Sequence, residues 1–117
     1  MNNTFQKKYT LAERSSESRK VLRKYPDRLP VLLQTNSGDI VLDKIKYLVP
    51  IDLTVGQFLH VIRKRIKLRA EEGLYLFLGG NTLVSTSAMM SDIYAKHRDP
   101  DNFVYFFAAK ENTFGSC

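Results

Sequence analysis

The sequence of 117 residues predicts a single α+β domain in which two helices precede a four-stranded mixed sheet. Three observations predict this fold. Residues 10–13 and 54–57 each form a capping box, in which a threonine and a Glu or Gln three residues later satisfy each other's backbone N–H groups. Residues 31–33 and 103–107 are apolar at every position, as expected of strands that are covered on both faces. The apolar fraction of 44% can fill one buried core.

The N-terminal helices come first along the chain. Thr10 begins a helix that should run to about Lys24, because Pro26 disfavours helical backbone at the residue before it. Asn3 or Thr4 can begin a shorter helix ahead of it. The apolar residues 29–33 and the returning residues 40–49 then predict a hairpin, with turn residues between them.

A second helical block follows the hairpin. Thr54 begins an amphipathic helix whose apolar residues recur at helical spacing. Residues 74–78 form a strand, Ser87 can cap a short helix, and residues 103–108 form the last strand. The order ββαβ, short helix, β is that of the ubiquitin-like β-grasp. The long helix can cover one face of the sheet and the two N-terminal helices the other.

These elements divide the chain into three parts. We expect an N-terminal helical extension over residues 1–26, a ubiquitin-like domain over 27–109 and a flexible tail over 110–117. The net charge of +6 belongs mainly to the first part, since eight Lys and Arg residues against three acidic residues give residues 1–28 a charge of +5. Binding to nucleic acid or to an acidic partner surface would each explain this excess.

Membrane and redox signals are few. No apolar run reaches the ~20 residues that span a bilayer. The first residues form no secretory signal, and Asn2 stands where myristoylation needs glycine, so any membrane attachment is expected to be added later. The single cysteine, Cys117, allows no internal disulfide, which fits the reducing cytosol or nucleus.

The sequence offers no convincing catalytic or metal-binding set. His60 and His97 are the only histidines, and His60 lies about 200° around its helix from Phe58, on the solvent side. Too few Cys and His residues exist for a metal site, and no cofactor motif is present. Gly79-Gly80 is internal and predicts a turn. The basic run Arg63-Lys64-Arg65 has a solvated helix face as its first explanation and a specific contact as its second.

Several motifs in one order resemble a known family. They are Lys24-Tyr25-Pro26-Asp27-Arg28-Leu29-Pro30, Lys46-Tyr47-Leu48-Val49-Pro50, Leu53-Thr54-Val55-Gly56-Gln57-Phe58, Ile62-Arg63-Lys64-Arg65-Ile66 and Glu111-Asn112-Thr113-Phe114-Gly115. From about Phe5 to Gly115 the chain is similar to the ubiquitin-like modifiers of autophagy, which include microtubule-associated protein light chain 3 and the GABA-receptor-associated protein. The first ten residues match least.

The resemblance implies that the chain is a substrate of conjugation and carries no catalytic group. A cysteine protease would cut between Gly115 and Ser116, and glycine suits a narrow cleft because it has no Cβ. Activating and carrier enzymes would then join Gly115 to phosphatidylethanolamine, whose two chains anchor stably. The cytoplasmic protein would thereby reach the autophagosome membrane. Contacts with these enzymes fall on Arg65, Tyr75, Phe77 and Phe114; the spacing of Tyr75 and Phe77 puts both on one side of a strand.

The resemblance also implies a groove for aromatic-x-x-aliphatic peptides of cargo receptors, which add a strand beside residues 46–50. The matching positions for the aromatic pocket are Glu17, Val21, Pro30, Lys46, Leu48 and Phe103. Those for the aliphatic pocket are Tyr47, Val49, Pro50, Leu53, Phe58, Val61 and Ile62. Acidic residues flanking the peptide would meet Arg28, Lys44 and Lys46.

Alternatives remain at this point. Ordinary core packing explains Phe58 and Ile62 equally well, whereas Tyr47 and Leu48 are adjacent on a strand and are not both expected in the core. An unconjugated ubiquitin-like adaptor could use the same groove. A basic microtubule- or RNA-binding module driven by residues 7–28 is a third hypothesis, although nucleic-acid binding favours exposed aromatic residues that this chain places mostly in strands. We expect a monomer that needs no cofactor.

Overall fold

The computed structural model describes residues 3–36, 38, 40–66, 68–69, 71–79 and 82–110. The helices are α1 (Thr4–Lys8), α2 (Leu11–Lys24), α3 (Val55–Arg65) and α4 (Met90–His97). The strands are β1 (Arg28–Gln34), β2 (Lys46–Pro50), β3 (Leu74–Leu78), β4 (Thr82–Leu83) and β5 (Val104–Lys110). The expected order of two helices, ββαβ, helix and strand is therefore present, with β4 in addition.

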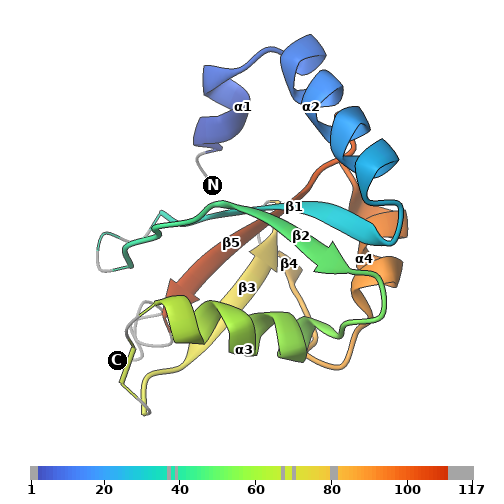
Figure 1. Cartoon of the computed structure of the whole chain (residues 1–117). Helices are drawn as coiled ribbons and strands as arrows, with labels where there is room; N and C mark the ends of the chain where they lie inside the picture. Colours follow the sequence, from blue (N-terminus) through green and yellow to red (C-terminus); the bar gives the residue numbers. More distant parts are fainter. Residues whose placement is uncertain are drawn as a thin grey trace.

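The strands form one mixed sheet in the order β2-β1-β5-β3-β4. β1 and β5 run parallel in the middle, and the other pairs are antiparallel. Helices α1 and α2 lie over one face, while α3 lies across the other (Figure 1). The α+β fold is as predicted. The strand count of four was wrong by one, because the two residues of β4 pair only with Phe77 and Leu78 and carry no strand signal of their own.

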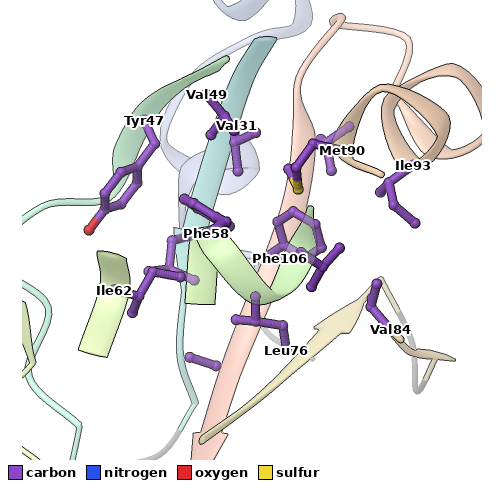
Figure 2. Packing of buried hydrophobic residues seen from close by; sticks show 14 of the residues in the cluster. Val31, Tyr47, Val49, Phe58, Ile62, Leu76, Val84, Met90, Ile93 and Phe106 are labelled. Carbon is purple, nitrogen blue, oxygen red and sulfur yellow. The ribbon is translucent and has the colours of Figure 1, made fainter. Parts of the chain in front are cut away.

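The two central strands are buried on both faces, as their continuous apolar runs predicted. Along β5, Phe106 packs in the larger core cluster under α3, whereas Tyr105 and Phe107 pack in the smaller cluster under α1. Leu32 of β1 belongs to the smaller cluster, and its neighbours on either side belong to the larger one. Alternate side chains thus point to opposite faces. Figure 2 shows the larger cluster around Phe58 and Phe106.

The helix starts follow from their caps, with one exception. Both capping boxes are present, with Thr10 bonded to the Glu13 N–H and Thr54 to the Gln57 N–H. Asn3 caps α1. Ser87 does not cap α4: Met89 holds that position without a side-chain hydrogen bond. Ser87 bonds Ser85 instead, because both hydroxyls lie in the turn before the helix.

The returning strand is shorter than predicted. It begins at Lys46, so residues 40–45 are not part of β2. Val41 is 80% exposed, and the charged residues Asp43 and Lys44 interrupt the apolar run. The backbone bond from the Leu33 N–H to the Ile45 carbonyl extends the pairing with β1 by one residue beyond the start of β2.

A buried polar network attaches α2 to the segment before β5. Asp101 is fully buried; its carboxylate accepts hydrogen bonds from Arg14 at 2.6 Å and from the hydroxyl of Tyr105. It also accepts the N–H of Phe103 at 2.8 Å, and its backbone carbonyl accepts the Ser18 hydroxyl. Burial, together with the hydrogen bond to Asp101, raises the pKa of Tyr105. Each polar group of this network therefore has a partner.

Replacing Asp101 tests how much this network contributes. Asp101→Ala leaves the Arg14 charge and the Tyr105 hydroxyl without their main partner, and breaking a buried pair in this way costs about 3–5 kcal/mol. We expect that loss in the free energy of unfolding measured with urea. The exposed Asp52→Ala is the matched control and should change it by less than ~0.5 kcal/mol. Equal values for the two variants would contradict this role.

Candidate functional site

Strand β2 is an open edge of the sheet. It pairs with β1 alone among the described residues. The N–H of Leu33 donates to Ile45 (2.7 Å) and that of Ile51 donates to Asp27 (3.3 Å), so the odd-numbered residues of β2 bond to β1. By alternation, the N–H and C=O groups of Lys46 and Leu48 point away from the sheet. The Arg28 guanidinium reaches one of them, the Leu48 carbonyl, at 3.4 Å.

The predicted aromatic-pocket residues lie on the α2 side of this edge. Leu48 is half-buried opposite the buried Pro30 in the strand register. Glu17 and Val21 are half-buried one helical turn apart on α2. The Lys46 ammonium bonds to the Glu17 carboxylate at 2.7 Å, which joins α2 to β2 across the site.

Sequence reasoning missed one member of this site, Phe5 of α1. Its ring lies 5.6 Å from that of Phe103, between centroids, in an edge-to-face contact. The Lys46 ammonium lies 5.4 Å from the same Phe5 ring. The first helix therefore packs against two of the predicted aromatic-pocket residues, Phe103 and Lys46. The sequence contained a signal that could have pointed to Phe5, because it is the only aromatic residue before Tyr9.

Most of the predicted aliphatic-pocket residues lie on the α3 side, but Pro50 follows the alternation of Lys46 and Leu48 and faces the α2 side. Tyr47, Val49, Phe58 and Ile62 are all in the larger core cluster (Figure 2). The rings of Tyr47 and Phe58 meet edge to face, with centroids 5.3 Å apart. Pro50 and Leu53 are half-buried, and Val61 is 44% exposed. Core packing of Phe58 and Ile62 is thus confirmed, and so is the expectation that Tyr47 and Leu48 are not both core residues.

Charged groups line the rim on the α3 side. The Lys44 ammonium lies 4.8 Å from the centre of the Tyr47 ring. Burial raises the pKa of Tyr47, Arg65 acts in the opposite direction, and Asp43 adds to the rise. Arg65 bonds to Asp43 at 3.1 Å, with both side chains well exposed. Unlike Arg65, the Lys44 ammonium has no carboxylate within ion-pair distance among the described residues.

The basic run at the end of α3 divides into two kinds of residue. The Arg63 guanidinium donates to the backbone carbonyls of Glu72 (2.7 Å) and Arg69 (3.3 Å), so it holds the segment after α3. Lys64 and Arg65 are exposed. The solvated-face explanation therefore does not hold for Arg63, which has a structural contact.

The predicted enzyme-contact residues do not form one cluster. Tyr75 and Phe77 share one side of β3, as their spacing predicted, and both pack in the smaller cluster under α1. Phe77 is only 8% exposed. Arg65 belongs to α3, which covers the opposite face (Figure 1). Phe114, Gly115 and Ser116 lie outside the described residues, as do Gly80 and Asn81 of the predicted turn.

Three general features of the described part bear on the class of protein. None of its helices is both long and apolar enough to cross a membrane. His60 is exposed on α3, where the sequence placed it. Within the same residues, no group of three His, Cys, Asp or Glu side chains gathers as a metal would need.

The comparisons with known proteins agree with this geometry. A family model described as "Autophagy protein Atg8 ubiquitin like" matches residues 13–115. The chain belongs to the Atg8 family of ubiquitin-like autophagy proteins. Autophagy-related protein 8a of Arabidopsis thaliana is 53% identical to this Atg8 family member over 108 residues, which cover 91% of this chain and 88% of the relative.

A fungal relative and a solved structure extend the match. Autophagy-related protein 8 of Aspergillus niger is 45% identical over 119 residues and the full length of both chains. The crystal structure of Trypanosoma brucei ATG8 superposes with a TM-score of 0.89 at 41% identity, covering 95% of this chain and 97% of that one. The family resemblance inferred from the motifs is therefore confirmed.

The two arginines of the basic run should differ in stability effect. Arg63→Ala removes a part-buried charged hydrogen bond to the Glu72 carbonyl, a kind that contributes about 1.5–3 kcal/mol, and a weaker, exposed one to the Arg69 carbonyl. Arg65→Ala removes an exposed ion pair worth less than ~1 kcal/mol. Urea unfolding of both variants checks this. An equal loss in the free energy of unfolding would mean that Arg63, like Arg65, is only part of a solvated helix face.

Proposed function

We propose that this Atg8 family member is a conjugated interaction module that binds aromatic-x-x-aliphatic peptides. One observation carries the proposal: the free edge of β2 has the predicted aromatic-pocket residues on one face and most of the predicted aliphatic-pocket residues on the other. A peptide strand that pairs with Lys46 and Leu48 would direct its alternate side chains to the two faces. The ligand thus gains backbone bonds along the edge and specificity from the faces.

Charge adds a second element of recognition. Lys46 is held by Glu17 in the free protein, so an acidic residue before the peptide's aromatic position would compete for the ammonium. Lys44 and Arg28 extend the cationic rim along the same strand. These contacts are exposed to water and salt, and we expect them to add selectivity rather than most of the affinity.

The carboxyl end would supply the attachment to membranes. Hydrolysis of the Gly115–Ser116 peptide bond by a cysteine protease releases Ser116-Cys117 and leaves a glycine carboxylate. ATP-dependent activation converts this carboxylate to a thioester on the activating and then the carrier enzyme. The amine of phosphatidylethanolamine displaces the thiol and forms an amide. The family match ends at residue 115, which supports a boundary at this glycine.

Arg65, Tyr75 and Phe77 remain proposed contacts for these enzymes, together with Phe114. Because Arg65 and the β3 residues lie on different faces, one enzyme would have to approach around the edge of the sheet, or different enzymes would use different faces. After conjugation the cytoplasmic protein would be held on autophagosomal membranes, where the free groove recruits cargo receptors.

Processing is tested at the glycine itself. In cell extract the full chain should lose two residues by intact mass, because the protease cuts after Gly115. Gly115→Ala should stay full length and should not reach membranes, since a Cβ obstructs a cleft that accepts only glycine. Cys117→Ser is the control and should be trimmed like the wild type. A Gly115→Ala variant that becomes membrane-bound would falsify the attachment site, and an untrimmed wild type would favour the unconjugated adaptor.

The groove is tested on Leu48, because Tyr47 is too deeply buried for a clean truncation. Leu48→Ala should weaken binding of an acidic, aromatic-x-x-aliphatic peptide about tenfold to a hundredfold, as burying an aromatic side chain contributes roughly 1.5–3 kcal/mol and ~1.4 kcal/mol is a factor of ten. Lys46→Ala should weaken peptide binding less than Leu48→Ala does. Added salt should remove the difference in affinity between Lys46→Ala and the wild type. Calorimetry measures both.

The exposed Val41→Ala serves as the control for the groove. It removes apolar atoms that lie outside β2 and should leave the peptide's dissociation constant unchanged. If folded Leu48→Ala binds as tightly as Val41→Ala, the peptide does not use this edge.

A further inference from the structure

Three elements meet at one end of the domain: residues 40–45 before β2, the last turn of α3 and the end of β5 (Figure 1, left). The Arg65 guanidinium bonds to the Asp43 carboxylate at 3.1 Å, which joins the segment before β2 to α3. Glu72 joins the same helix to β5, because its backbone carbonyl accepts Arg63 and its carboxylate accepts Lys110. The end of the domain where β5 stops is therefore one connected surface.

This end carries apolar side chains that the core does not use. Val41 is the most exposed large apolar side chain among the described residues, at 80%. Ile40 before it is buried and Leu42 after it packs against the larger core cluster, so Val41 projects from an anchored backbone into solvent. Ile45, in the same segment, is 37% exposed. Single exposed apolar residues are common, but these two lie close together in sequence and beside cations.

The cations at this end outnumber the acidic groups. Lys44 lies in the same segment, and Lys64 and Arg65 are exposed in the last turn of α3. Asp43 pairs with Arg65, and within the described residues neither lysine has a carboxylate at ion-pair distance. Three cations against one acid give these side chains a charge of +2. Exposed apolar groups among such cations fit the interface of an anionic bilayer, where apolar side chains reach the acyl chains and ammonium groups stay with the headgroups.

We propose that this end of the domain docks onto an anionic lipid bilayer. The docking surface consists of Val41, Lys44, Ile45, Lys64 and Arg65. The inference rests on the proposed attachment at Gly115 and adds which part of the domain meets the membrane. Gly115 follows Lys110 by five residues, which span at most roughly 17 Å. That length keeps the end of β5 near the bilayer, and the docking surface then determines which side of the domain faces it.

Weak contacts are sufficient once the chain is attached. A short tether gives an effective concentration on the order of millimolar, so a surface with a dissociation constant of that size is about half docked. Full burial of one valine side chain favours the docked state about tenfold or more. Each cation near an anionic surface adds about fivefold. The same contacts leave an untethered chain mostly in solution.

The full chain allows a direct test, because it has no tryptophan and a single cysteine. Val41→Trp puts a fluorescent reporter on the docking surface. Leu11→Trp on α2 and Leu83→Trp on β4 put it at positions that are 50% and 55% exposed elsewhere. Cys117 couples each variant to a maleimide lipid in vesicles of phosphatidylcholine and phosphatidylserine, so no processing enzyme is needed. Brominated acyl chains should quench Val41→Trp and shift its emission to shorter wavelength, while both controls should keep their emission in solution.

A second arm tests the charges on the Val41→Trp background. Lys64→Ala should lower the ratio of docked to undocked chains about fivefold, because it removes one cation from the surface. Lys96→Ala is the matched control, an exposed lysine in the last turn of α4, and should leave the ratio unchanged. Lys64 lies outside the groove, so the affinity for the groove peptide should stay at the value of the wild type.

The outcomes separate this inference from the proposed function. Quenching that is absent at position 41, or equal at positions 41, 11 and 83, overturns the docking proposal. Equal ratios for Lys64→Ala and Lys96→Ala overturn it as well. Coupling through Cys117 bypasses the protease and the conjugation enzymes. A wild type that cell extract never trims would therefore defeat the proposed processing and leave the docking result standing.

Discussion

The middle of the sheet has no face open to water, and the rest of the molecule is arranged around that constraint. β1 and β5 are apolar at successive positions, so each face needs a cover. α3 covers one face, and Phe5 of α1 packs on the other against Phe103 and Tyr105. The N-terminal helices are therefore part of the core, and removing them would expose the aromatic residues of the smaller cluster. The basic residues of this segment occupy its outer surface, except for Arg14.

A covered centre leaves the edges of the sheet for recognition. Edge strands are prone to unwanted pairing and are commonly protected by charge and by proline. β2 carries both, with Lys46 at its start and Pro50 at its end. Between them only Leu48 offers an uncharged position with outward backbone groups, which suits pairing with one short peptide. The Asp101 network supports this arrangement, because it holds Phe103 and, through Arg14 and Ser18, the helix that carries Glu17.

The sequence predicted what depends on neighbouring residues. Capping boxes placed the starts of α2 and α3, and continuous apolar runs predicted two-sided burial of the central strands. The sequence did not predict β4, and the prediction that Ser87 caps α4 was wrong. Strand pairing and turn geometry at these positions are decided by other segments. The polar contacts were invisible for the same reason: Arg14 and Asp101 are 87 residues apart, and Asp101 follows a proline in what resembles a surface turn. The family motifs supplied the groove residues, but only the structure separates Leu48 from the buried Tyr47.

Helix α3 connects the two regions that the proposed function uses. Its inner face places Phe58 against Tyr47 behind the groove, and its last turn places Arg63 on the carbonyl of Glu72 next to the root of the tail. The two contacts involve different side chains and share no partner, and effects of separate sites of this kind usually add. Peptide binding at β2 is therefore not expected to disturb the contact between Arg63 and the Glu72 carbonyl. In the proposed function the chain would be held on a membrane by its carboxyl end and occupied by a peptide at β2, and additive contacts of α3 with the two regions would let each operate without the other.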